Sequence, residues 1–70
     1  MNFSFSDNRI AELREEQHLS QRQLAQLIGT SNANLSRWEQ GLIVPSVLEC
    51  WKLADFFGVS IDFLCGRSDY

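Results

Sequence analysis

The side chains best suited to chemistry lie between positions 31 and 40, where amides, hydroxyls and one guanidinium fall on what we expect to be one face of a helix. A surface helix more often shows Glu and Lys in such places. The polar residues and the alanine among them are Ser31, Asn32, Ala33, Asn34, Ser36, Arg37 and Gln40. Amide and guanidinium groups carry the paired donors and acceptors that read base edges in DNA. The stretch therefore favours nucleic-acid recognition.

Patterns typical of catalysis or metal binding are missing from the sequence. There is no phosphate-binding loop and no nucleophile with a nearby base. Cys50, Cys65 and His18 provide only three soft ligands without paired spacing, so we expect no metal. Both cysteines lie in apolar surroundings, which favours two small buried side chains over a disulfide or a reactive thiol. We predict no enzyme activity, no cofactor and no small-molecule ligand.

The length and composition describe one small globular domain. A chain of 70 residues buries only about 60% of the surface that its unfolded form exposes, so the core must be small. The content of 44% hydrophobic and 21% charged residues is too apolar for a disordered chain. No apolar run approaches the roughly 20 residues of a membrane span, and the first residues do not form a signal peptide. We therefore expect a cytoplasmic protein that does not associate with membranes.

Polar helix starts and glycine stops divide the chain into about five short helices, which predicts an all-α fold. Ser6 or Asp7 is expected to cap a first helix over about 8–18. The capping box that begins at Ser20 opens a second helix, which runs to about Ile28. The later helices are expected over about 32–40 after Ser31, from Ser46 to a stop at Gly58, and after Ser60, where a short helix contains Ile61 and Leu64.

Helical spacing also predicts which side chains point inward. Trp38 and Trp51 are both expected in the core. The inward face of the fourth helix is predicted to consist of Val47, Cys50, Trp51, Ala54 and Phe57. Leu48 and Phe56 then fall elsewhere on that helix, and Phe63 flanks the inward residues of the fifth. Phe3 and Phe5 have no evident place in the core.

The residues of the second and third helices predict how these two helices pack against each other. Two helices joined by a turn of three or four residues cross at a steep angle. The small Ala25 suits the crossing point, and Gly29 suits the turn, where the backbone needs positive φ. The large residues that fill the angle are Leu24, Ile28, Leu35 and Trp38. The polar face over 31–40 then points away from the core.

These spacings resemble the phage repressor and Cro-type helix-turn-helix domain, the lambda repressor-like family. The matching positions are Leu19-Ser20-Gln21, Leu24-Ala25, Ile28-Gly29, Ser31, Leu35-Ser36, Trp38-Glu39 and Gly41. The resemblance continues outside them at Arg9-Ile10, Leu13-Arg14, Pro45-Ser46, Leu53-Ala54, Gly58-Val59-Ser60-Ile61-Asp62 and Leu64. It implies a five-helix DNA-binding domain over 7–66, with an N-terminal arm at 1–6 and a tail at 67–70.

The resemblance also implies roles for individual residues. Gln21 would bind a phosphate and support the start of the third helix. Asn32, Ala33 and Arg37 match the family's base-reading positions, while Ser31, Asn34, Ser36 and Gln40 would hold the backbone or flanking bases. Arg14 and Glu39 match a structural pair that joins the first and third helices. The function implied is that of a repressor-like transcriptional regulator that reads the major groove of double-stranded DNA at a palindromic operator.

A homodimer follows from the same resemblance, because one recognition helix reads only a few base pairs and relatives use two half-sites. Leu48, Phe56 and Phe63 are the candidate interface residues. The alternative is a protein-interaction module, antirepressor-like or antitoxin-like, that kept the fold and lost DNA binding. The net charge of −3 favours this alternative. The charge is uneven, however, since residues 20–41 sum to +1 while 1–19 and 42–70 each sum to −2.

Overall fold

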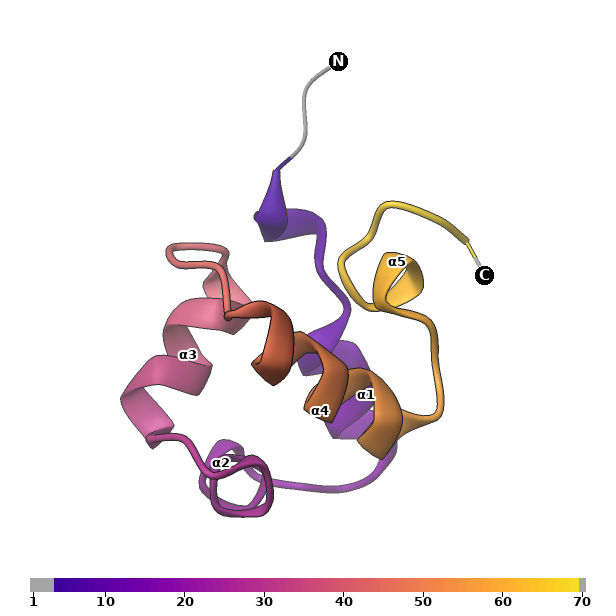
Figure 1. Ribbon diagram of the computed structural model, residues 1–70. Coiled ribbons are helices and arrows are strands. Elements are labelled where there is room, and N and C mark those ends of the chain that lie inside the picture. Colours follow the sequence, from indigo (N-terminus) through magenta and orange to yellow (C-terminus); the bar gives the residue numbers. More distant parts are fainter. Residues whose placement is uncertain (1–3, 70) are drawn as a thin grey trace.

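The computed structural model describes residues 4–69, and these residues form α-helices and one 3-10 turn without any strand (Figure 1). The elements are η1 (Phe5–Asp7), α1 (Ile10–Glu16), α2 (Gln21–Ile28), α3 (Asn32–Gln40), α4 (Val47–Phe57) and α5 (Ile61–Leu64). The predicted all-α fold with five helices is confirmed. No helix in this part of the chain is long and apolar enough to cross a membrane.

The start of the first helix differs from the prediction. Ser6 and Asp7 lie inside η1 and do not cap α1, which begins only at Ile10. The side-chain oxygen of Asn8 accepts a hydrogen bond from the Ile10 amide at 3.0 Å. The reason is that Phe5 packs against the core, contrary to the expectation that it has no place there, and this contact holds the chain in a separate turn. Phe3 lies outside the described residues.

The predicted joint between α2 and α3 is confirmed in detail. Ser20 accepts from the amide of Gln23, whose side chain accepts from the Ser20 amide, so the capping box is complete. Gly29 has φ of 84°, the left-handed conformation that lets the chain leave α2 at once. Ser31 then caps α3 by accepting from the amide of Asn34 at 3.0 Å.

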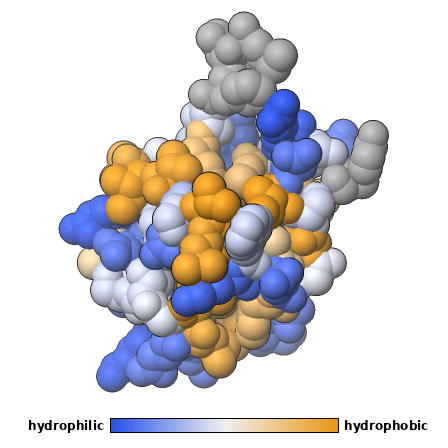
Figure 2. Space-filling view, in the orientation of Figure 1, coloured by the Kyte–Doolittle hydropathy of each residue, from blue (hydrophilic) through white to orange (hydrophobic). Residues whose placement is uncertain are grey.

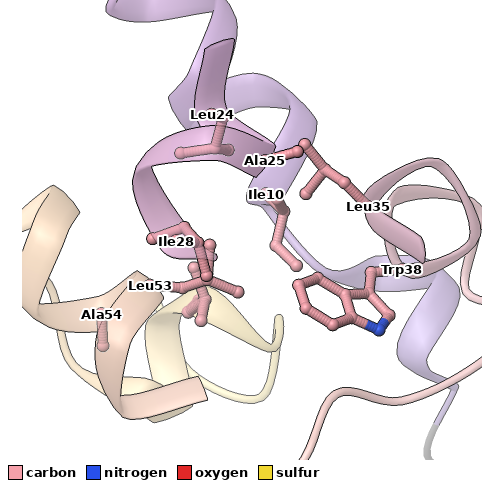
Figure 3. Packing of buried hydrophobic residues seen from close by; sticks show 9 residues of the cluster. Ile10, Leu24, Ala25, Ile28, Leu35, Trp38, Leu53 and Ala54 are labelled. Atoms are coloured by element: carbon pink, nitrogen blue, oxygen red, sulfur yellow. The ribbon is translucent and has the colours of Figure 1, made fainter. Parts of the chain in front are cut away.

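The core receives side chains from every α-helix, and Figure 3 shows most of them close together. Ala25 of α2 lies beside Leu35 of α3, which is where a small residue was expected. Ile10 of α1 and Trp38 of α3 meet at the centre of the same view. The buried residues of the cluster are Ile10, Leu24, Ala25, Ile28, Leu35, Trp38, Leu53, Ala54 and Leu64.

The predicted inward face of α4 is partly wrong. Cys50 and Ala54 are buried, and Phe57 packs against the core as expected. Val47 and Trp51, however, are 66% and 54% exposed, while Leu53 is fully buried. The buried face is therefore turned away from Val47 and Trp51 toward Leu53, because α4 packs against α2 and α5 on that side. Of the two predicted core tryptophans, only Trp38 is buried.

Two residues before α1 tie the chain ends to the helices. The Asn8 side-chain amide donates to the carbonyl of Trp38, at the end of α3, at 2.9 Å. The Arg9 guanidinium lies 4.2 Å from the centre of the Phe63 ring and donates to the Ser68 carbonyl. Gly41 lies directly against η1. The approach is so close that a Cβ at this position would be 2.5 Å from the Ser6 backbone. The contacts of Asn8 and Gly41 fix the end of α3, and those of Arg9 join the start of α1 to α5 and the residues after it.

Candidate nucleic-acid interface

The inner side of α3 is anchored by a part-buried ion pair. Arg14 Nε donates to Glu39 Oε2 at 2.7 Å and Arg14 Nη2 to Glu39 Oε1 at 3.2 Å. The Arg14 side chain is 14% exposed and that of Glu39 only 6%. The hydrogen bond to Glu39 raises the pKa of Arg14 further above its already high usual value. A third bond, from Arg14 Nη1 to the Leu19 carbonyl at 2.8 Å, joins the α1–α2 link to the same group.

Gln21 completes this arrangement from the start of α2. Its Nε2 donates to Glu39 Oε1 at 2.9 Å, so one carboxylate receives bonds from both α1 and α2. The expectation that Gln21 supports the start of α3 is therefore corrected, since Glu39 is in the last turn of that helix. The network fixes the orientation of α3 relative to α2, with its charges paired. The predicted Arg14–Glu39 pair is present.

The outer face of α3 carries the predicted reading residues. Asn32, Ala33 and Arg37 are exposed, and no hydrogen bond or ion pair within residues 4–69 involves the side chain of Asn32 or Arg37. Their donors and acceptors are therefore available to a ligand. One helical turn separates positions 33 and 37, so the methyl group and the guanidinium lie on one side of the helix.

The other four predicted residues are engaged within the α3 region. The Ser31 hydroxyl accepts the capping bond, and the Asn34 side chain lies 3.4 Å from the Thr30 hydroxyl. Gln40 Nε2 donates to the Ser36 hydroxyl at 3.0 Å. These contacts hold the side chains in place, which fits the supporting role that the resemblance gives them better than a reading role.

The charges on the α2–α3 side of the protein favour binding of a polyanion. Arg22 and Arg37 are exposed there, and the only acid in these two helices, Glu39, is neutralised by Arg14. The exposed carboxylates lie outside these two helices, namely Asp7 of η1, Glu12, Glu15 and Glu16 of α1, Asp55 of α4, Asp62 of α5 and Asp69 after it. The amino-terminal ends of α2 and α3 add partial positive charge. Sequence reasoning did not single out Arg22, although its place beside Gln21 could have indicated it.

The remaining candidates occupy different surroundings. Leu48 is 59% exposed on α4, and Phe56 is exposed while its ring packs edge to face on Phe57 at 5.1 Å. Phe63 is half-buried beneath Arg9. Of the three predicted interface residues, Leu48 and Phe56 are exposed, and Phe63 is partly covered.

The two cysteines are free thiols, Cys50 buried and Cys65 half-buried. Burial raises the pKa of Cys50 to about 11. Within residues 4–69 no group of three or more His, Cys, Asp or Glu side chains could hold a metal ion.

Two helices crossing over a glycine turn, with a polar outer face on the second, define a helix-turn-helix DNA-binding fold. The helix-turn-helix family model matches residues 10–64, and the chain belongs to this family. The transcriptional repressor RstR of a cryptic CTXphi phage in Vibrio cholerae is 37% identical over 59 residues, which cover 84% of this chain and 53% of RstR. The transcriptional regulator PuuR of Escherichia coli is 36% identical over 53 residues, covering 76% of this chain and 29% of PuuR. The chain thus spans about half the length of RstR.

Solved structures share the fold. The P22 c2 repressor, crystallised with a synthetic operator, gives a TM-score of 0.81 over 97% of this chain and 100% of that chain, at 24% identity. The restriction-modification controller protein C.AhdI of Aeromonas hydrophila gives a TM-score of 0.74 over 87% of this chain and 92% of that chain, at 30% identity. The predicted resemblance to phage repressors is confirmed.

Proposed function

We propose that this chain is a sequence-specific DNA-binding regulator of transcription, repressor-like in action, whose α3 lies in the major groove of a palindromic operator. The observation that carries the proposal is the division of α3 into two sides. Its inner side is held by the Arg14–Glu39–Gln21 network, while its outer side presents unpaired Asn32 and Arg37. A rigid helix with free amide and guanidinium groups is what base reading requires.

The residues divide into reading and positioning groups. Arg37 can pair with both acceptors of a guanine edge, and the Ala33 methyl suits the methyl group of thymine. Asn32 reads a neighbouring base. Gln21 and the amides at the start of α2 contact phosphate, where helix ends attract anions. Ser31, Asn34, Ser36 and Gln40 line the backbone or flanking bases. The domain spans 7–66, with 1–6 as an arm and 67–70 as a tail, and the family match over 10–64 supports these bounds.

Selection of binding sites from random duplex DNA at low salt tests the proposal. A palindromic consensus is the expected result. Low salt is needed because the chain has only six Lys and Arg residues, and each phosphate contact contributes a slope of about 0.9 in the logarithm of affinity against that of salt. Failure to enrich any sequence would reject the function and favour the protein-interaction module, which the net charge of −3 supports.

Arg37→Ala and Gln21→Ala form a matched pair within this experiment. Arg37→Ala is expected to cost about 1–3 kcal/mol on the selected site and to relax the choice at one base pair. Gln21→Ala is expected to weaken binding equally on selected and random DNA, because phosphate contacts carry no sequence information. Equal losses on both DNAs for Arg37→Ala would show that this side chain touches only the backbone.

A further inference from the structure

The two cysteines lie in contact where α4 packs against α5. Cys50 of α4 is only 7% exposed, and Cys65 is the C-cap of α5, directly after the fully buried Leu64. The packing of the two helices brings the thiols together, and their side chains form a hydrogen bond. The spacing of the cysteines in the sequence does not indicate this contact, because it depends on the way the chain turns back after α4 and returns as α5 (Figure 1).

The surroundings of both thiols favour the protonated form. Figure 2 shows hydrophobic side chains gathered over the α3–α4 loop and α4, the elements around Cys50. Burial raises the pKa of Cys50 to about 11, and Cys65 and Glu49 act in the same direction. Burial also raises the pKa of Cys65, while the hydrogen bond from Cys50 opposes this rise and the charge of Asp62 adds to it. Both thiols are therefore protonated at neutral pH and react slowly.

Cys65 is the thiol that an oxidant reaches first. It is half-buried, whereas Cys50 is buried and its Sγ also donates to the Pro45 carbonyl at 3.7 Å. The hydrogen bond from Cys50 stabilises the thiolate of Cys65, which is the form that attacks an oxidant. A sulfenic acid formed at Cys65 has a second thiol beside it, and this arrangement leads to a disulfide.

We propose that Cys50 and Cys65 form an intrachain disulfide when the protein meets hydrogen peroxide, and that this bond ties α5 to α4. The Cys65 thiolate attacks one peroxide oxygen, so an S–O bond forms, the O–O bond breaks, and hydroxide leaves and takes up the proton that Cys65 lost. The Cys50 sulfur then attacks the sulfenic acid of Cys65. An S–S bond forms, the S–O bond breaks, and the Cys50 proton leaves with that oxygen as water. The two thiols lose two electrons, and one peroxide becomes two waters.

The bond strengthens the attachment of the shortest α-helix. α5 is a single turn over Ile61–Leu64, too short to be stable by itself. Its packing and the Arg9 guanidinium, which donates to the carbonyls of Phe63 and Ser68, hold it in place. The disulfide closes a loop of about fifteen residues, which favours the folded state on the order of 100-fold in the chain-entropy account. The proposal does not rest on DNA binding, because neither α2 nor α3 takes part in the bond.

Mass spectrometry of the peroxide-treated chain tests the bond. Treatment at about pH 9 raises the thiolate fraction, and the chain is then unfolded and alkylated. The wild-type chain is expected to stay a single chain of 8.1 kDa, to lose two hydrogens and to take up no alkyl group, and dithiothreitol should restore both thiols. Met1 is the only methionine, so its oxidation adds the same oxygen to every variant.

Cys50→Ser and Cys65→Ser form a matched pair for the order of the two steps. Cys50→Ser leaves Cys65 without a partner and should carry it to the sulfinic acid, which dithiothreitol does not reverse. Cys65→Ser leaves only the buried thiol and should react most slowly. Wild-type chains that keep both thiols, gain oxygen at Cys65 in place of the bond, or join copies to one another would overturn the proposal.

Thermal unfolding and amide exchange test whether the bond ties α5 to α4 in the native fold. The oxidised wild-type chain should melt about 10 °C or more above the reduced chain. The amides of α5 should exchange roughly tenfold more slowly after oxidation, because opening of this turn is restricted. Cys65→Ser should show neither change, and Cys65→Ala repeats that comparison without adding a hydroxyl group to the α4–α5 contact. An unchanged or lower melting temperature of the oxidised wild-type chain would reject the proposal.

Discussion

The α2–α3 pair and α4 contribute to the same core, but the sequence alone predicts the buried face only for α2 and α3. In α2 and α3 the apolar residues are few, and all except Leu27 and Ala33 are buried. In α4 the only polar residues are Glu49, Lys52 and Asp55. Spacing identifies a buried face only where polar residues mark the outside. Where almost every position is apolar, the neighbouring helices decide which side is covered.

Two overlapping stripes of α4 illustrate the difference. One contains Val47, Cys50 and Trp51, and the other contains Cys50, Leu53 and Ala54. Both have helical spacing, so periodicity does not choose between them. The fold buries the second stripe, and the residues left over from the first become surface.

The largest expected effect concerns the polar network that holds α3, which has no counterpart in α4. Glu39→Ala removes one partner of a pair whose side chains are 14% and 6% exposed, and leaves the Arg14 guanidinium with only the Leu19 carbonyl and the exposed Glu15 carboxylate. The free energy of unfolding should fall by about 3–5 kcal/mol. Urea unfolding measures it. A double-mutant cycle with Arg14→Met and Glu39→Leu should show strong coupling, and its absence would remove the pair as a stabilising unit.

The second prediction tests the face of α4 directly. Leu53→Ala should cost about 2–5 kcal/mol, because the side chain is fully buried. Trp51→Ala should cost less, about 1 kcal/mol, because the side chain is 54% exposed. Thermal or urea unfolding of the two variants compares them. The reverse ranking would show that the face predicted from spacing is the buried one.

The smallest of these effects should be the same in both regions. Ser20 and Ser46 each form a complete capping box, one opening α2 and the other α4. Ser20→Ala and Ser46→Ala should each cost about 1 kcal/mol. Substitution by Gly provides the control, since it should cost only a few tenths of that. A much larger loss at one of the two sites would mean that the two helices differ in more than their apolar content.

Local signals in the sequence were sufficient for most of the fold. The caps at Ser20, Ser31, Ser46 and Ser60 and the stop at Gly29 act over a few residues, and all are observed. The start of α1 depends on a distant contact. Phe5 packs on the core, and nothing near Ser6 or Asp7 in the sequence indicates it.

The candidate site shows the same limit. The polar face of α3 and the Arg14–Glu39 pair were predicted, and both are present. The bond from Gln21 to Glu39 was not, because it depends on the crossing of α2 and α3 in space, and the spacing of residues does not fix that angle. The roles of Asn32, Ala33 and Arg37 in reading bases stay predictions until DNA binding is measured.

The unequal burial of the two tryptophans gives the protein two optical reporters. Trp38 is 2% exposed and should emit at short wavelength, shielded from quenchers such as acrylamide, until the core opens. Trp51 is 54% exposed and should emit at long wavelength and be quenched readily. Trp51→Phe therefore yields a fluorescent sensor of folding at α3, while Trp38 variants would report the surface of α4. The indole of Trp38 reports unfolding, and the indole of Trp51 reports binding of another molecule to the surface of α4.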